Sequence, residues 1–164
     1  SPMSLINHRR RSARWHGASQ KVGQSAAPLF LDRIDIQCEI TPVPFKDISK
    51  AAPGEPSANI RERVIKAREI QAARYKDYKG IHCNAQMTER MIHQFAEPNE
   101  AGIDMLRMAM EKLSLSARAY SRILKVARTI ADLEGCEHVE LHHLAEAIGY
   151  RALDRGDWAE RGHI

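Results

Sequence analysis

The chain has 164 residues, of which 43% are apolar and only 5% aromatic. This length favours one domain, or one domain plus tails, and a core poor in aromatic residues favours packed helices over a sandwich of strands. Five of the 25 basic residues and none of the 21 acidic ones lie in residues 1–27, which leaves 20 basic against 21 acidic residues elsewhere. The charge of +4 therefore belongs to the N-terminal tail, and the rest of the chain is close to neutral.

The cysteines and the apolar runs exclude two further classes of protein. Cys38, Cys83 and Cys136 are odd in number and widely spaced, which is not the pattern of a disulfide framework. No run of 18 apolar residues is present, so we expect no membrane-spanning helix and no membrane partner. We expect the protein to be cytoplasmic.

Residues 1–27 lack the periodicity of a helix or a strand and predict a disordered or divergent basic tail. Its arginines and its tryptophan could bind phosphates and stack on a base, as in proteins that bind single-stranded nucleic acid. A solvated tail without a ligand explains the same composition equally well. The residues concerned are Arg9, Arg10, Arg11, Arg14 and Trp15.

Residues 28–56 predict one strand followed by a linker. In residues 28–41, PLFLDRIDIQCEIT, apolar residues alternate with polar ones from Ile34 to Ile40, which is the period of a strand with one apolar face. Residues 42–56 contain four prolines and a glycine and predict a linker, with no helix before Pro56.

Residues 57–152 predict a helical domain. A long helix is expected over 57–78, with Ser57 as its N-cap and an inward face of Ile60, Val64, Ala67, Gln71 and Tyr75. Further helices are expected over about 88–96, 99–113, 115–135 and 140–152, and residues 153–164 should form a frayed tail. Thr88 should cap the first of these helices, and Gly135 should end the third. The expected core includes Ile103, Leu106, Leu141 and Leu144. The predicted fold class is therefore mainly α: a bundle of about four to five helices, preceded by one strand and a disordered tail.

The sequence lacks the motifs that would give this chain a complete catalytic site. No phosphate-binding loop, dinucleotide fingerprint, nucleophile elbow or zinc-protease motif occurs in it. One group of metal-ligand residue types, Cys136, His138, His142 and His143, lacks the paired spacings of a structural zinc site. We interpret these residues as exposed histidines at a helix start and predict no metal site.

Two arginines are candidates for contacts with phosphate. Arg33 lies in LDRID, at the start of the predicted strand, and could reach a neighbouring molecule. Arg118 lies in the first turn of a predicted helix, where a cation opposes the helix dipole and an anionic ligand would reverse the balance. The alternative is a solvated polar face that also contains Arg122, Lys125 and Arg128.

Several segments resemble the magnesium-chelatase-like AAA+ ATPases of bacteria, of the ComM/YifB type. They are PLFLDRIDIQCEITPVPF, GEPSANIRERVIKAREIQAARY, LSLSARAYSRILKVARTIADLEG and LAEAIGYR, and the likeness covers about residues 28–152. The resemblance implies that residues 28–56 are the end of the AAA+ core and that 57–152 are the helical lid, the magnesium-chelatase C-terminal domain. The Walker A and Walker B motifs of the family are not in this chain, which looks like an inactive fragment of an ATPase.

The resemblance also implies roles for residues and partners. Arg33 corresponds to a candidate arginine finger that reaches the nucleotide of the neighbouring subunit, and Arg118 to a candidate sensor 2 that contacts the nucleotide phosphates. ATP and Mg would bind the full-length parent, a homo-oligomeric ring and possible DNA helicase, and not bind tightly to this fragment. The alternative is a DNA-binding module that uses the basic tail together with Arg118, Arg122 and Lys125. A role in metal chelation is disfavoured because the chain offers no convincing set of ligands.

Overall fold

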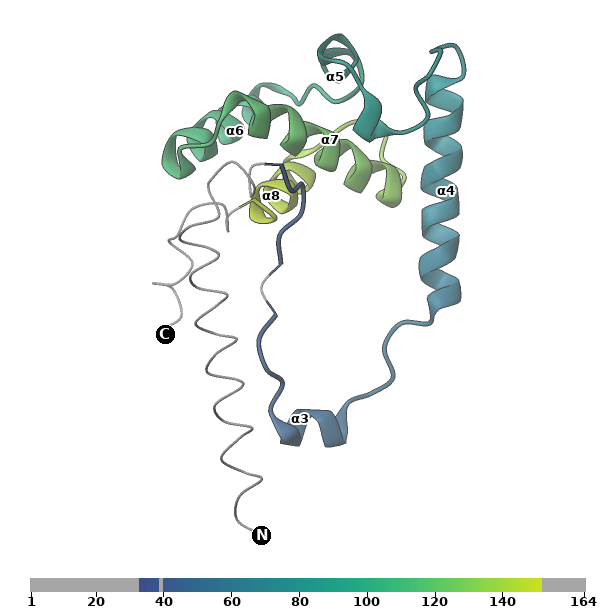
Figure 1. Ribbon diagram of the computed structural model, residues 1–164, viewed down its shortest axis with the longest axis vertical. Coiled ribbons are helices and arrows are strands. Elements are labelled where there is room, and N and C mark those ends of the chain that lie inside the picture. The colour runs from purple at the N-terminus through teal and green to yellow at the C-terminus, as the bar shows by residue number, and fades with distance from the viewer. Residues whose placement is uncertain (1–32, 39, 152–164) are drawn as a thin grey trace. The chain divides into compact units, whose positions relative to one another are not determined.

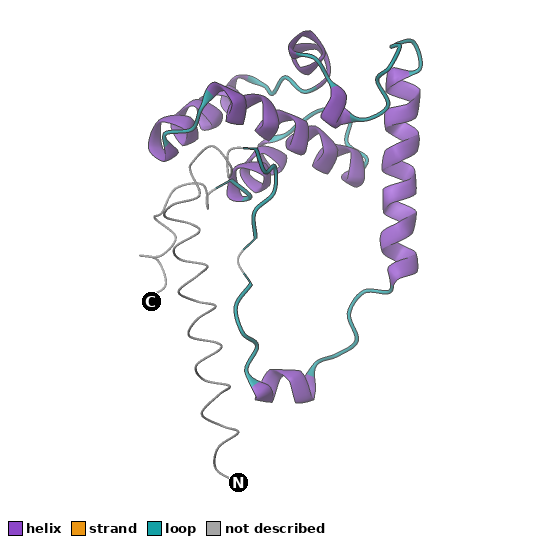
Figure 2. Cartoon of the chain, in the orientation of Figure 1, coloured by secondary structure: helices purple, strands orange, loops and turns teal. Residues whose placement is uncertain are grey.

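The computed structural model describes residues 33–38 and 40–151. The chain divides into two compact units, and of the first unit only Arg33 and Ile34 are described. The second unit, Asp35–Ala152, holds all the described helices. Within the described residues the secondary structure is entirely helical, as Figure 2 shows, which confirms the prediction of a mainly α bundle.

The strand predicted over 28–41 is wrong for the part of it that is described. Residues 33–38 and 40 form a turn, a bend and loop, and Ile36 and Ile40 are 52% and 91% exposed. One backbone hydrogen bond, from Gln37 N to the carbonyl of Tyr150 at 2.9 Å, joins this segment to the end of the domain. A strand needs a ladder of such bonds to a partner strand, and a lone alternating segment has none.

The linker contains a short helix that the prolines did not predict. Helix α3, Phe45–Lys50, begins directly after Pro44 and ends three residues before Pro53. A proline is tolerated where a helix begins, because the first N–H groups have no intrahelical partner. The expectation of no helix before Pro56 was therefore wrong.

Helix α4, Ser57–Tyr75, buries only its C-terminal half. Ala67, Gln71 and Tyr75 are buried as predicted, whereas Ile60 and Val64 are 44% and 39% exposed. Ser57 is the first helical residue and its side chain makes no capping bond, so its predicted role as N-cap was also wrong. The apolar stripe continues along α4 beyond the part that meets the domain.

Helices α5, Glu89–Phe95, and α6, Glu100–Leu113, begin at side-chain caps. The hydroxyl of Thr88 accepts from Met91 N, and the amide oxygen of Asn99 accepts from Gly102 N. Leu106 is fully buried as expected, but Ile103, predicted to be inside, is 42% exposed.

Helix α7, Ala117–Glu134, lies at the centre of the domain and packs against α4, α5 and α8 (Figure 1). Ser116 caps its start and Gly135 ends it with a φ of +77°, a conformation that favours glycine. Its buried face fills the core with Ile123, Leu124, Ala127 and Ala131. Both ends are where the sequence placed them.

Helix α8, Leu141–Gly149, packs against α6 and α7. Leu144 and Ala147 are buried, while the predicted core residue Leu141 is 38% exposed. None of the described helices is both long enough and apolar enough to cross a membrane.

A buried polar network joins α4 to α7. Asp132 accepts hydrogen bonds from Arg74, from Arg128 at 3.1 Å and from the side-chain amide of Asn84 at 2.8 Å. Burial lowers the pKa of Arg128, and its guanidinium also donates to three backbone carbonyls, those of Phe95, Cys136 and Glu137. Buried charges require such partners, so Arg128 is structural, although the sequence placed it on the solvated basic face.

Candidate functional site

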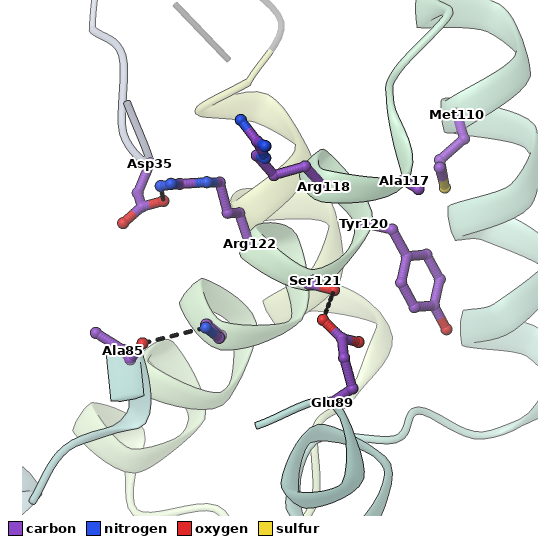
Figure 3. A pocket seen from close by; sticks show the side chains of 10 residues that line it. Asp35, Ala85, Glu89, Met110, Ala117, Arg118, Tyr120, Ser121 and Arg122 are labelled. Carbon is purple, nitrogen blue, oxygen red and sulfur yellow. Dashed lines mark hydrogen bonds and ion pairs between the residues drawn. The ribbon is translucent and has the colours of Figure 1, made fainter. Parts of the chain in front are cut away.

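A pocket of about 680 Å³ lies along the first two turns of α7. Figure 3 shows this pocket, with the side chains of Arg118 and Arg122 extending from α7 beside Asp35. Lys125 lines the same pocket one turn further on. The structure therefore brings together three residues that the sequence singled out, and Figure 3 also shows Glu89, Tyr120 and Ser121 around them.

The local sequence explains why these three cations share one face. They stand at positions i, i+4 and i+7 of α7, a spacing that places side chains on one side of a helix. Because Ser116 caps the helix, Arg118 falls in its first turn, near backbone N–H groups without an intrahelical acceptor. Guanidinium groups next to a helix N-terminus form an arrangement suited to phosphate.

Two carboxylates complete the site, and the sequence did not identify either. Asp35 pairs with Arg122, and Glu89 accepts a hydrogen bond of 2.7 Å from the hydroxyl of Ser121. Lys125 donates to the carbonyl of Ala85 at 3.1 Å. The pocket therefore combines three cations with two acids, and of the three cations only Arg118 has a side chain classed with the exposed residues.

The carboxylates also affect a neighbouring tyrosine. Partial burial raises the pKa of Tyr120, and the negative charges of Glu97 and Glu89 raise it further. Tyr120 therefore stays protonated at neutral pH and contributes a neutral hydroxyl to the pocket wall.

The other predicted site residues are Arg33 and those of the basic tail. Arg33 is exposed, in a turn of the first unit, and its predicted role at a neighbouring subunit remains a prediction. The proposed nucleic-acid contacts of the tail lie outside the described residues: Arg9, Arg10, Arg11, Arg14 and Trp15.

A cluster of histidines at the junction of α7 and α8 resembles a metal site in composition. The ligand atoms of Glu134, His142 and His143 lie within 4.8 Å of one another. His143, however, is fully buried, and its Nδ1 accepts a hydrogen bond of 2.9 Å from Glu140 N. Since a neutral imidazole has one acceptor nitrogen, Nε2 carries the proton and donates to Glu134 at 2.6 Å.

This geometry gives the cluster a structural role. With its proton on Nε2, His143 has no lone pair for a metal ion, and it instead completes a capping box with Glu140 at the start of α8. His142 adds a second contact to Glu134 at 2.9 Å. The sequence interpreted both histidines as exposed, which is correct for His142 and wrong for His143.

Comparison with known proteins identifies the relatives of this fold. Residues 54–151 match the family described as "Magnesium chelatase, subunit ChlI C-terminal". The competence protein ComM of Haemophilus influenzae is 43% identical over 127 residues, which are 77% of this chain and 24% of that protein. The uncharacterized protein YifB of Escherichia coli is 41% identical over the same length, and an uncharacterized protein of Mycobacterium tuberculosis is 32% identical over 130 residues.

The match covers helices α4 to α8, and with them the α7 residues that line the pocket, whereas Asp35 lies outside it. The chain spans about a quarter of the length of these curated relatives. It belongs to the magnesium chelatase C-terminal domain family and is similar to the C-terminal domain of ComM/YifB-type proteins.

Proposed function

We propose that this chain is the lid domain of a ring-forming AAA+ ATPase and that Arg118 contacts the phosphates of ATP as sensor 2. The observation that carries the proposal is the pocket at the start of α7, where Arg118, Arg122 and Lys125 line one open cavity. A volume of about 680 Å³ is within the range of small-molecule sites.

The physical role of Arg118 follows from its position. A bound phosphate would receive the guanidinium and the N–H groups at the start of α7 together, which reverses the unfavourable effect of a cation at a helix N-terminus. In phosphoryl transfer the main contribution of a protein is positioning and stabilisation of charge. The Walker motifs that hold ATP and Mg would come from the remaining three quarters of a protein as long as the relatives.

Arg33 has a separate place in this proposal. As an arginine finger it would contact the nucleotide of the next subunit in the ring, so that each site needs two chains. An arginine of this kind stabilises the transition state and contributes about 10³- to 10⁵-fold in turnover in well-characterised cases.

The test is Arg118→Ala in the longer ATPase of which we propose this chain is a part. ATP turnover should fall about a hundredfold, as expected for the loss of one group that stabilises charge in the transition state. Arg107→Ala is the matched control, because Arg107 is an exposed arginine of α6 that does not line the pocket. Equal turnover in both variants would refute the sensor role, and circular dichroism of the 164-residue chain checks that both fold.

A second candidate function is DNA binding through the same three cations. The spacing of Arg118, Arg122 and Lys125 along α7 favours it, while Asp35 and Glu89 in the same pocket disfavour a polyanion as long as DNA. Titration of the chain with single- and double-stranded DNA at low salt tests it. Affinity that falls steeply with salt and is lost in an Arg122→Ala, Lys125→Ala double variant would support DNA contacts, and no binding at low salt would refute them.

A further inference from the structure

Among the described residues, two contacts attach the segment that follows Arg33 to the helical domain. The carboxylate of Asp35 pairs with the guanidinium of Arg122 on α7. Two residues later, the N–H of Gln37 donates to the carbonyl of Tyr150, directly after α8. Segment 35–37 is thus held against two different helices, although 87 positions of chain separate Asp35 from Arg122.

The ion pair adds little to the stability of the fold. The side chains of Arg122 and Asp35 are 27% and 48% exposed, and ion pairs in contact with solvent contribute little to stability. Its larger consequence is positional, because a guanidinium bound to a carboxylate fixes where segment 35–37 lies along α7. Arg122 is one helical turn from Arg118, so the attachment point lies on the helix that carries the proposed phosphate contact.

We propose that Asp35 and Arg122 are positioning residues that couple the segment carrying Arg33 to helix α7. The inference rests on the proposed function of Arg118 and Arg33. Two residues of chain reach at most about 7 Å, so Arg33 cannot move far from Asp35. When Arg118 binds phosphate and α7 is displaced, the displacement is transmitted through the pair of Arg122 and Asp35 to Arg33. In this way the nucleotide state of one subunit sets the position of the arginine offered to its neighbour.

The attachment itself can be tested in the 164-residue chain without any nucleotide. Asp35→Ala and Arg122→Ala should each speed hydrogen exchange of the Gln37 amide severalfold, because the segment loses the contact between Asp35 and α7. Asp104→Ala is the matched control, since it breaks an exposed pair with Arg107 on α6. Unchanged exchange at Gln37 in both test variants would overturn the inference whatever the function of the pocket.

The coupling is tested in the longer ATPase by exchanging the two charges. Asp35→Arg and Arg122→Asp should each lower kcat about five- to a hundredfold, the range of typical coupling between sites, with the KM for ATP unchanged. The double variant should recover most of the lost turnover, because the pair is restored with its charges reversed.

Three other results would overturn the inference, and they are distinguishable. If the double variant stays as slow as Arg122→Asp alone, Arg122 contacts phosphate directly and is no positioning residue. If Asp35→Arg is harmless while Arg118→Ala is slow, the coupling fails and the proposed function stands. If Arg118→Ala is also harmless, the proposed function fails and the coupling fails with it.

Discussion

At the scale of single residues, the cations of the site could be predicted from the sequence, but the carboxylates that share the pocket with them could not. Arg118, Arg122 and Lys125 could be found because helical spacing alone places them on one face. Asp35 could not, because its alternating context predicted a strand and its contact with Arg122 spans 87 positions. Local patterns carry no signal for a contact at such separation.

Gly102 shows how little space separates α6 from its neighbours. A Cβ at this position would lie 2.6 Å from Cβ of Pro98 and 2.8 Å from Cδ1 of Leu144 on α8. We predict that Gly102→Ala lowers the free energy of unfolding by about 1–3 kcal/mol, since the rigid proline cannot yield and the core would be overpacked.

Urea denaturation of the chain measures this effect. Gly149→Ala is the control, because nothing lies within 4 Å of a Cβ built there and Gly149 is also helical. If Gly102→Ala were as stable as the parent chain, α6 and α8 would not approach as closely as described.

At the scale of elements, the helices with clear caps were the predictable ones. Thr88, Ser116 and Gly135 end or begin helices where the sequence placed them. The burial of the first half of α4 was mispredicted, because periodicity shows which residues share a face and not whether another element covers that face. Ile60 lies on the same face as the buried Gln71, yet Ile60 is exposed. The short helix α3 was not predicted, because the prolines were interpreted only as residues that end a helix and not as residues at which a helix can begin.

The network around Asp132 should be the strongest polar link between α4 and α7. Asp132→Ala leaves Arg128, which is 2% exposed, without a carboxylate. We predict that this substitution lowers the free energy of unfolding by about 3–5 kcal/mol, the range for breaking a buried ion pair. In urea denaturation, Asp104→Ala on the exposed face of α6 should change it by less than about 1 kcal/mol. Similar small losses in both variants would contradict the structural role of the network.

The junction of α7 and α8 should make stability depend on pH. Hydrogen bonds from His142 and His143 lower the pKa of Glu134 in the folded chain. A carboxyl whose pKa is lowered by folding stabilises the fold above its ordinary pKa of about 4.3, and this contribution is lost as the pH falls through the lowered value.

Glu134→Gln removes that contribution. The unfolding free energies of the parent chain and the variant should therefore differ most near neutral pH, and the difference should shrink in acid below about pH 4. Urea denaturation across this pH range measures both. A difference that stays constant down to the acid limit would contradict the assigned contacts of Glu134.

At the scale of the whole molecule, the described domain supplies one side of a proposed nucleotide site. Its described core is helical, its match to the family covers residues 54–151, and the part of the chain that aligns with ComM makes up 24% of that protein. In the proposed role of a lid, the domain would contact a nucleotide held by other parts of a longer protein, so it would need no complete catalytic centre of its own.

The proposed phosphate site is tested most directly by an NMR titration of the 164-residue chain with Mg–ATP at millimolar concentration. We predict weak binding, with chemical-shift changes concentrated in the backbone amides of residues 117–122, lost in Arg118→Ala and retained in Arg107→Ala. Shifts that are absent from 117–122, or that persist unchanged in Arg118→Ala, would contradict a phosphate site at the start of α7.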